Sequence, residues 1–242
     1  MEIRGTTALV TGAGRRVGRT LALALAEAGA DVIVNYHQSA AAAAETVAAI
    51  EQLGRRARAV RADIAQPEQA RALVAAALDA FGRLDILVNS ASRFERAPLA
   101  EITPEDWDRV LGVNLKAPFL LAQAAADALR AAHGTIINIV DLSAFQPWPS
   151  FIPHAVSKAG LLHLTRGLAR ALAPHVRVNA IAPGTVLPPE DYDGTDYAGG
   201  ADRRVLERAG TPEDVARALL YLAGSDFVTG EVLVVDGGRL LL

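Results

Sequence analysis

The sequence predicts a single-domain α/β fold, a doubly wound parallel sheet of seven strands with helices on both faces. Short, nearly continuous apolar segments alternate with amphipathic helical segments along all 242 residues. This alternation is typical of parallel strands that are buried on both faces. The first strand candidate, Thr6–Val10, leads directly into the glycine-rich turn TGAGRRVG at 11–18 and then into an alanine-leucine helix. That order is the usual first unit of such a sheet.

The remaining elements follow from the same patterns. The expected strands share an apolar run bounded by turn residues: Thr6–Val10, Asp31–Tyr36, Ala57–Arg61, Leu84–Asn89, Gly134–Val140, Val176–Ile181 and Val232–Val235. Helical patterns fill the intervals at Val17–Gly29, Ala40–Leu53, Glu68–Phe81, Pro104–Ala132, Ala155–Ala173 and Pro212–Gly224. Two helices begin with threonine, proline and two acids, at 103–106 and 211–214, which is a capping signature.

No linker, repeat or low-complexity block divides residues 1–242, so we expect one domain. The run from Pro188 to Gly200 is polar and irregular, and it follows a strand end. Ligands bind beyond the carboxyl ends of strands in open α/β sheets. We therefore interpret about 187–207 as a lid over a substrate rather than as a domain boundary.

Composition excludes several classes of function. The net charge of −3 gives no basic excess for nucleic acid or an anionic membrane surface. The absence of cysteine excludes disulfides, thiolate catalysis and zinc-thiolate centres, and we expect no metal site. The first ten residues lack a signal-peptide pattern, and no apolar run reaches the roughly 18 residues of a membrane span. A cytoplasmic protein with a small-molecule substrate fits these observations.

The glycines of the first turn point to a dinucleotide. Gly12 allows a tight turn, Gly14 allows the backbone to approach a pyrophosphate, and Gly18 allows the helix to pack closely on the strand. The free N–H groups of the helix start would then face the phosphates. The alternative is an ordinary glycine turn between a strand and a helix.

Several segments together resemble the short-chain dehydrogenase/reductase family, and within it the pteridine reductases. The resemblance covers the whole chain, with its motifs in the expected order. They are TGAGRRVG at 11–18, Asp63, NYHQSA at 35–40, LVNSAS at 87–92 followed by Arg93 and Phe94, Asn114, IINIVD at 136–141, SK at 157–158, VNAIAPG at 178–184 and VDGG at 235–238.

The resemblance implies a Rossmann fold with strand order 3-2-1-4-5-6-7, a nicotinamide cofactor and a homotetramer. The residues implied at the cofactor are Gly12, Gly14, Arg15, Arg16, Val17, Gly18, Tyr36, His37, Ser39, Asp63, Ile64, Asn89, Ala91, Lys158, Pro183, Gly184, Thr185 and Val186. From the residues alone, Asp63 could equally be a cap before a helix, and Asn89 a turn residue at a strand end. Apolar surface on Ala155–Ala173 and at Leu240, Leu241 and Leu242 also favours a homotetramer or dimer.

The end of the second strand favours NADP over NAD. NAD selectivity needs a carboxylate there to accept a hydrogen bond from the ribose 2′-hydroxyl. Tyr36, His37 and Ser39 bring no acid to this position. Arg15, His37 and Ser39 can instead donate to a 2′-phosphate. The alternative for His37 is a solvated loop residue.

The catalytic residues depart from the family pattern. The family's tyrosine, four residues before its lysine, is replaced by His154, one helical turn before Lys158. The family's serine is replaced by Asp141, as in pteridine reductases, and Asn114 matches the fourth member. The resemblance implies that Lys158 holds the nicotinamide ribose. Lys116 and Lys158 are the only lysines in an arginine-biased chain, and we interpret Lys116 as a helix-surface residue.

Whether His154 donates a proton depends on its neighbours. A free imidazole has a pKa of about 6.5, against about 10 for a phenol. Lys158 disfavours the imidazolium form, while an ionised Asp141 at hydrogen-bond distance favours it. We expect His154 and Asp141 to act as a coupled pair, with one ring nitrogen facing the space above the nicotinamide. The alternative is a packing histidine with no chemistry.

Two residues point to the substrate. The resemblance places Arg16 near the cofactor phosphate and a bound pterin, and Phe94 on the face of that ring. The alternative for Phe94 is loop packing against Leu99. The prediction is an NADPH-dependent reductase acting on a C=N or C=O bond of a small planar substrate at a site that includes Arg16, Phe94, Asp141 and His154. The alternatives are a general carbonyl or 3-ketoacyl reductase and a catalytically weak NADP-binding protein.

Overall fold

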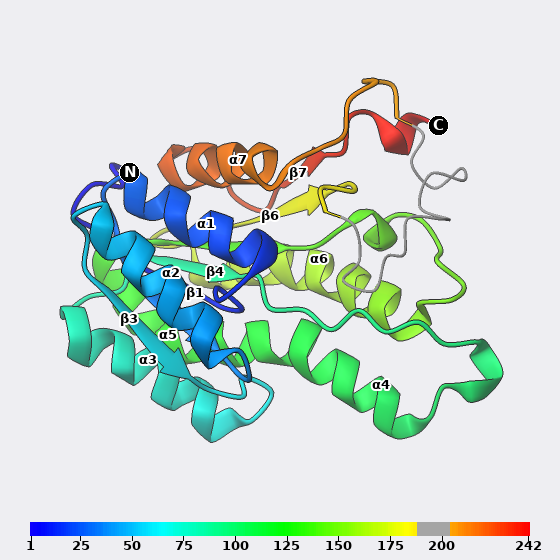
Figure 1. Cartoon of the computed structure of the whole chain (residues 1–242), viewed down its shortest axis with the longest axis horizontal. Coiled ribbons are helices and arrows are strands. Elements are labelled where there is room, and N and C mark those ends of the chain that lie inside the picture. The colour runs from blue at the N-terminus through cyan, green and yellow to red at the C-terminus, as the bar shows by residue number, and fades with distance from the viewer. Residues whose placement is uncertain (188–203) are drawn as a thin grey trace.

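The computed structural model describes residues 1–187 and 204–242, and it contains a seven-stranded parallel sheet flanked by helices (Figure 1). The strands lie in the order β3-β2-β1-β4-β5-β6-β7, and every neighbouring pair is parallel. The predicted fold class and strand order are therefore confirmed. The change of direction between β1 and β4 creates a crevice at their carboxyl ends, where ligands bind in this class of sheet.

The element bounds lie close to those expected from sequence. The strands are β1 (Thr7–Val10), β2 (Asp31–Tyr36), β3 (Ala57–Arg61), β4 (Ile86–Asn89), β5 (Thr135–Ile139), β6 (Arg177–Pro183) and β7 (Val232–Val235). The helices are α1 (Arg16–Glu27), α2 (Ala40–Gln52), α3 (Pro67–Phe81), α4 (Pro104–Leu111), α5 (Ala117–Ala132), α6 (Ile152–Leu172) and α7 (Pro212–Gly224). Among these described helices, none combines the length and apolar character needed to cross a membrane.

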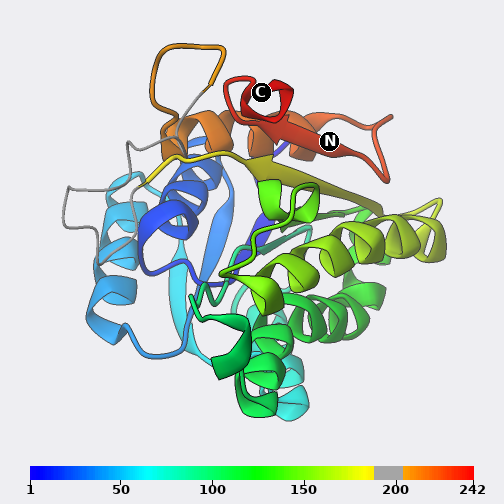
Figure 2. The same cartoon turned by 90° about the vertical axis from the view of Figure 1, so that its right-hand side faces the viewer.

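The two largest hydrophobic cores lie on opposite faces of the sheet. On β1, Ala8 and Val10 face α1, α2 and α7, while Leu9 faces α3, α5 and the end of α6. The view along the sheet in Figure 2 shows these two helical layers with the strands between them. Alternate side chains of a strand point to opposite faces, so the unbroken apolar strands are explained by burial on both sides.

Polar side chains fix the carboxyl edge of the sheet, where the site lies. The Thr11 hydroxyl accepts hydrogen bonds from the backbone N–H groups of Ser90 and Ala91, both at 3.0 Å. The buried Asn35 side chain donates to the carbonyls of Val60 and Ala62 at 3.3 and 3.4 Å. The loops after β1, β2, β3 and β4 are thereby held in register at the crevice.

The helix predicted over Pro104–Ala132 is not continuous. It is divided by a π-helical turn, η2 (Gly112–Lys116), between α4 and α5. A π turn adds a residue to the helical repeat and often occurs at functional sites. Here it directs the buried Asn114 toward the site. The expectation was wrong because hydrophobic periodicity does not reveal a single wide turn.

Both predicted capping signatures form. The Thr103 hydroxyl accepts from the backbone N–H of Asp106 at 3.1 Å, and the Asp106 carboxylate accepts from the Thr103 N–H at 3.1 Å. At α7, the Asp214 carboxylate accepts from the Thr211 N–H at 2.9 Å. The reciprocal bonds satisfy N–H groups that a helix start otherwise leaves unpaired.

Candidate active site

The glycine turn between β1 and α1 fits a phosphate group. A Cβ on Gly12 would lie 2.9 Å from the Ala91 Cα, and a Cβ on Gly18 would come closer than 3.0 Å to the Gly12 carbonyl oxygen. The first turn of α1 contains no acid, and the side chain of its N-cap residue, Arg15, makes no capping hydrogen bond. The helix therefore presents its positive end and N–H groups toward the crevice, as an anion site requires.

Arg16 adopts an uncommon backbone conformation in this turn. Its φ of +53° lies in the left-handed region, which is costly for a side-chain-bearing residue. Glycine would adopt this conformation without that cost, so the arginine is held in the turn against its backbone preference.

An arginine side chain that the sequence did not predict lies beside the loop after β2. Arg61, at the end of β3, lies opposite Tyr36 in the sheet register, and its Nε donates to the His37 carbonyl at 3.2 Å. Arg61 and His37 are both exposed, and no acid stands in the segment from 36 to 39. Register, rather than any motif, brings Arg61 to this loop.

Asn89 ends β4 on the buried side of the crevice. Its amide nitrogen donates to the Asn138 Oδ1 at 2.8 Å, while its own Oδ1 is buried and has no partner among residues 1–187 and 204–242. A buried unpaired oxygen is costly and fits a site for a polar ligand or water. Asp63 accepts from the Ala65 N–H at 3.1 Å in the loop before α3, but the N-cap of that helix is Gln66, so Asp63 is not the helix cap of the alternative interpretation; Ile64 is buried beside it.

The predicted catalytic residues converge. The His154 Nε2 lies 2.6 Å from the Asp141 Oδ2, and the Lys158 Nζ donates to the Ile139 carbonyl at 2.9 Å. His154 is 2% exposed and Lys158 3%. Burial lowers the pKa of Lys158 below its usual range, and the charge of Asp141 opposes this effect.

Asp141 stays ionised despite its own desolvation. Burial raises its pKa, but the His154 hydrogen bond, the charges of Lys158 and His154, and the Ser143 hydroxyl together hold the pKa below its ordinary value. The Ser143 N–H also donates to the Asp141 Oδ1 at 2.9 Å. The His154 Nε2 therefore faces a carboxylate, which can only accept.

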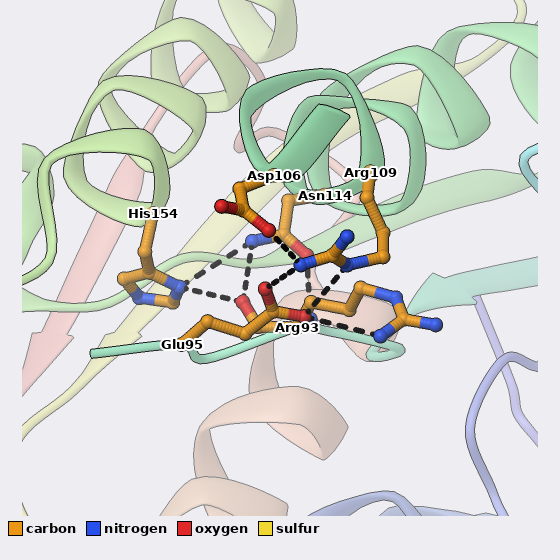
Figure 3. Close-up of polar contacts among 6 residues, drawn as sticks. All are labelled: Arg93, Glu95, Asp106, Arg109, Asn114 and His154. Atoms are coloured by element: carbon orange, nitrogen blue, oxygen red, sulfur yellow. Dashed lines mark hydrogen bonds and ion pairs between the residues drawn. The ribbon is translucent and has the colours of Figure 1, made fainter. Parts of the chain in front are cut away.

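The second ring nitrogen does not face open space, contrary to expectation. The His154 Nδ1 lies 3.0 Å from the Arg93 carbonyl oxygen (Figure 3). Asn114 Nδ2 is also close to Nδ1, at 3.3 Å, but its two N–H groups have shorter contacts, to Arg93 O at 2.9 Å and Ser157 Oγ at 3.0 Å. Nδ1 is therefore also left with an acceptor.

Each ring nitrogen of His154 thus lies against an acceptor. Neutral imidazole has one N–H donor, whereas imidazolium has two. With the Asp141 carboxylate at Nε2 and the Arg93 carbonyl at Nδ1, only the imidazolium satisfies both contacts. Of the pair, Asp141 is the more accessible, since its side chain is 21% exposed against 2% for His154.

Aromatic side chains form a wall beside this pair. The Phe94 ring stacks on Phe151 at a centroid distance of 4.3 Å. It meets the His154 ring edge to face, at a centroid distance of 4.8 Å. The Trp148 ring lies nearly parallel to His154, 6.4 Å away. Phe94 remains 49% exposed, so one part of it is available to a ligand. These rings are its aromatic packing partners, and the sequence alone did not identify Trp148 or Phe151.

The strand end after β6 completes the crevice. Pro183 closes β6, and the Gly184 Cα approaches Asp236 so closely that a Cβ would lie 2.9 Å from the Asp236 Cα. The Thr185 hydroxyl accepts from Arg239 at 3.2 Å, and Val186 packs on the core. Most of the expected lid, 188–203, lies outside the described residues. Within the described part, no cluster of three or more histidines or acids could hold a metal ion.

Comparison with known proteins agrees with this geometry. The family described as Enoyl-(Acyl carrier protein) reductase matches residues 12–239. The chain belongs to the short-chain dehydrogenase/reductase family. It is 39% identical to the 3beta-hydroxysteroid dehydrogenase 1 of Eggerthella lenta, with 99% of this chain and 95% of that protein covered. It is 36% identical to the 3-oxoacyl-acyl-carrier-protein reductase of Synechocystis, with 97% and 96% covered.

A solved relative has the same overall structure. The short-chain dehydrogenase from Burkholderia cenocepacia, crystallised in complex with NADP, superposes with a TM-score of 0.92 at 37% identity, over 98% of this chain and 99% of that one. The chain is thus an oxidoreductase of the short-chain dehydrogenase/reductase family.

Proposed function

We propose that the protein is an NADPH-dependent reductase that reduces a C=O or C=N bond in a small, planar substrate. The observation that carries this proposal is the 2.6 Å contact between His154 and the ionised Asp141, beside the buried Lys158. Together they form a charged, partly desolvated proton-donating centre at the crevice of a dinucleotide-binding sheet.

NADP(H) is the proposed cofactor. The glycine turn would hold its pyrophosphate, Arg15, His37, Ser39 and Arg61 would receive its 2′-phosphate, and Lys158 would hold the nicotinamide ribose. The relative from Burkholderia cenocepacia, crystallised with NADP, supports this choice. When bound, the cofactor supplies a hydride.

The protein's own residues would supply the proton. Hydride addition leaves negative charge on the substrate oxygen or nitrogen, which needs one proton. The imidazolium at His154 gives its Nε2 proton to Asp141, and Asp141, as the more exposed member, passes a proton to the substrate. Asp141, the more exposed member, then takes up a proton from solvent and returns it to the neutral ring at Nε2. The two groups act as one pair with shared apparent titration steps.

The aromatic wall favours a flat substrate. Phe94, Phe151 and Trp148 border the His154 ring, and an aromatic face favours offset stacking with a ring-shaped ligand. This arrangement supports a pteridine-reductase-like activity. A carbonyl or 3-ketoacyl reductase is the second candidate, favoured by the Synechocystis relative. The enclosure of both His154 nitrogens favours the third, a catalytically weak NADP-binding protein.

Phe94→Ala tests the substrate class. We expect purified protein to oxidise NADPH with a dihydropterin or quinone, and the variant to raise the KM for that ring substrate about fivefold, since a stacking contact contributes on the order of 1 kcal/mol. Its KM for a small aliphatic ketone should stay unchanged. Steady-state kinetics on a panel of dihydropterins, quinones, ketones and ketoacyl thioesters measures this. Tight NADPH binding with no turnover on any of them would support the weak binding protein instead.

Arg61→Gln tests whether the site recognises the 2′-phosphate of the cofactor. Removing this guanidinium should weaken NADPH binding about tenfold and leave NADH binding unchanged, because only the 2′-phosphate needs the charge. Titration calorimetry at several salt concentrations measures both constants. Arg58→Gln, an exposed arginine on the same strand that lies opposite Ile33, is the matched control. Equal losses for NADPH and NADH would contradict the assignment.

The homotetramer and the cytoplasmic location stay predictions. Surface apolar side chains on α5 and α6, Phe119 and Val156, and at the carboxyl end, Leu241 and Leu242, are compatible with subunit contacts.

A further inference from the structure

We infer that Glu95 is a positioning residue for His154: its ion pairs with Arg93 and Arg109 fix the peptide whose carbonyl accepts the His154 Nδ1 proton. This inference rests on the proposed function for its kinetic consequence, although the state of the ring can be measured without it. It concerns a set of charges on the loop after β4 and on α4 that contact neither the glycine turn nor Asp141.

Both backbone polar groups of Arg93 are held. Its N–H donates to Asn114 Oδ1 at 2.7 Å, and its carbonyl accepts from Asn114 Nδ2 at 2.9 Å and from His154 Nδ1 at 3.0 Å. Because one carbonyl serves both side chains, a small rotation of the peptide between Arg93 and Phe94 would remove the acceptor from the imidazole. The orientation of Arg93 thus determines whether His154 keeps a second donor contact.

The side chains around Glu95 anchor that peptide to α4. Glu95 accepts from Arg93 Nη1 at 3.1 Å and from the Arg109 guanidinium in a two-point contact, at 2.7 and 3.2 Å. Arg109 also bonds Asp106, which closes the capping box at the start of α4. Figure 3 shows this continuous set of contacts from α4 through Glu95 and Arg93 to His154.

The charges indicate that the set is formed at neutral pH. The Arg109 hydrogen bond, opposed by burial and aided by Arg93, holds the pKa of Glu95 below its usual value. A single exposed ion pair contributes little, but a two-point arginine contact within a network has defined geometry. Its effect here is transmitted to a buried ring, where an acceptor matters more than at the surface.

Among residues 1–187 and 204–242, few charged groups face the imidazole itself. Asp141, at the start of η3 (Leu142–Ala144), lies 2.6 Å from its Nε2 as a hydrogen-bond acceptor, and Lys158 stands one turn along α6. The loop after β4 contributes the Arg93 carbonyl, with the Arg93 side chain directed to Glu95. The neighbouring rings of Phe94, Trp148 and Phe151 carry no charge. Loss of the carbonyl would therefore leave Asp141 as the main support of the imidazolium.

Glu95→Gln tests the inference in the full-length protein. We expect kcat to fall about fivefold, the size of effect that one ion-pair contact can supply, and the alkaline fall in activity to move to lower pH. Asp127→Asn, which removes the exposed Arg130–Asp127 pair on α5, is the matched control and should change neither. Glu95→Gln combined with Arg109→Gln should be no worse than either single variant, because the two residues act through the same contact.

Nuclear magnetic resonance of the histidine rings provides a readout that needs no turnover. The chain has only five histidines, and His154→Gln assigns the signal of interest. In Glu95→Gln the His154 ring should lose its proton at lower pH than in the parent protein. An unchanged titration of the ring together with an unchanged pH profile would overturn the inference. If the parent protein oxidises NADPH with none of the substrates in the panel, the proposed function is overturned. The titration of the His154 ring would still decide the role of Glu95.

Discussion

Asp141→Asn is expected to lower kcat by about two to three orders of magnitude, which is the usual contribution of a positioned proton donor. In the parent protein the pKa of Asp141 is held low, so the carboxylate persists as the pH falls and keeps the His154 imidazolium paired. Activity should therefore decline as the pH rises and the pair loses its proton. In the variant this decline should shift to lower pH, because the charge that supports the imidazolium is gone.

Rapid-mixing kinetics across a pH series would measure both effects, and NADPH affinity serves as the internal control. The substitution preserves size and leaves the glycine turn untouched, so cofactor binding should change by less than about threefold. A variant with the parent rate and the parent pH profile would show that Asp141 and His154 take no part in proton transfer. That result would support the alternative that the protein is a catalytically weak NADP-binding protein.

Gly18→Ala is expected to weaken NADPH binding by at least about tenfold. The added Cβ would overlap the Gly12 carbonyl oxygen, so the turn or the start of α1 must shift. Either movement displaces the N–H groups that would face the pyrophosphate. Gly18 is buried, so some loss of stability should accompany the loss of affinity.

Gly167→Ala is the matched control for this substitution. Gly167 lies within α6, and a Cβ there would meet nothing within 4 Å. Alanine should therefore stabilise the helix by about 0.5–1 kcal/mol and leave NADPH affinity unchanged. Calorimetric titration gives the affinities, and thermal unfolding gives the stabilities. Unaltered NADPH binding by Gly18→Ala would mean that the cofactor does not use this turn.

The sequence alone was sufficient to predict the fold, the glycine turn and the proximity of His154 and Lys158. Alternating strands and helices predicted the parallel sheet, and the family likeness predicted its strand order, because apolar periodicity and turn residues are local signals. The TGAGRRVG turn and the spacing of His154 and Lys158 are local as well. A helical turn places residues four apart on one face, so their proximity required no knowledge of the rest of the chain.

The tertiary structure decided the other contacts of the site. The acceptor at the His154 Nδ1 is a backbone carbonyl at Arg93, and every residue type carries such a group, so no sequence pattern marks it. The π turn that aims Asn114 at it adds only one residue to a helix. Likewise, Arg61 reaches the loop at His37 because β2 and β3 pair in one register. Such contacts join segments far apart in the chain, and they are fixed by packing and register rather than by residue type.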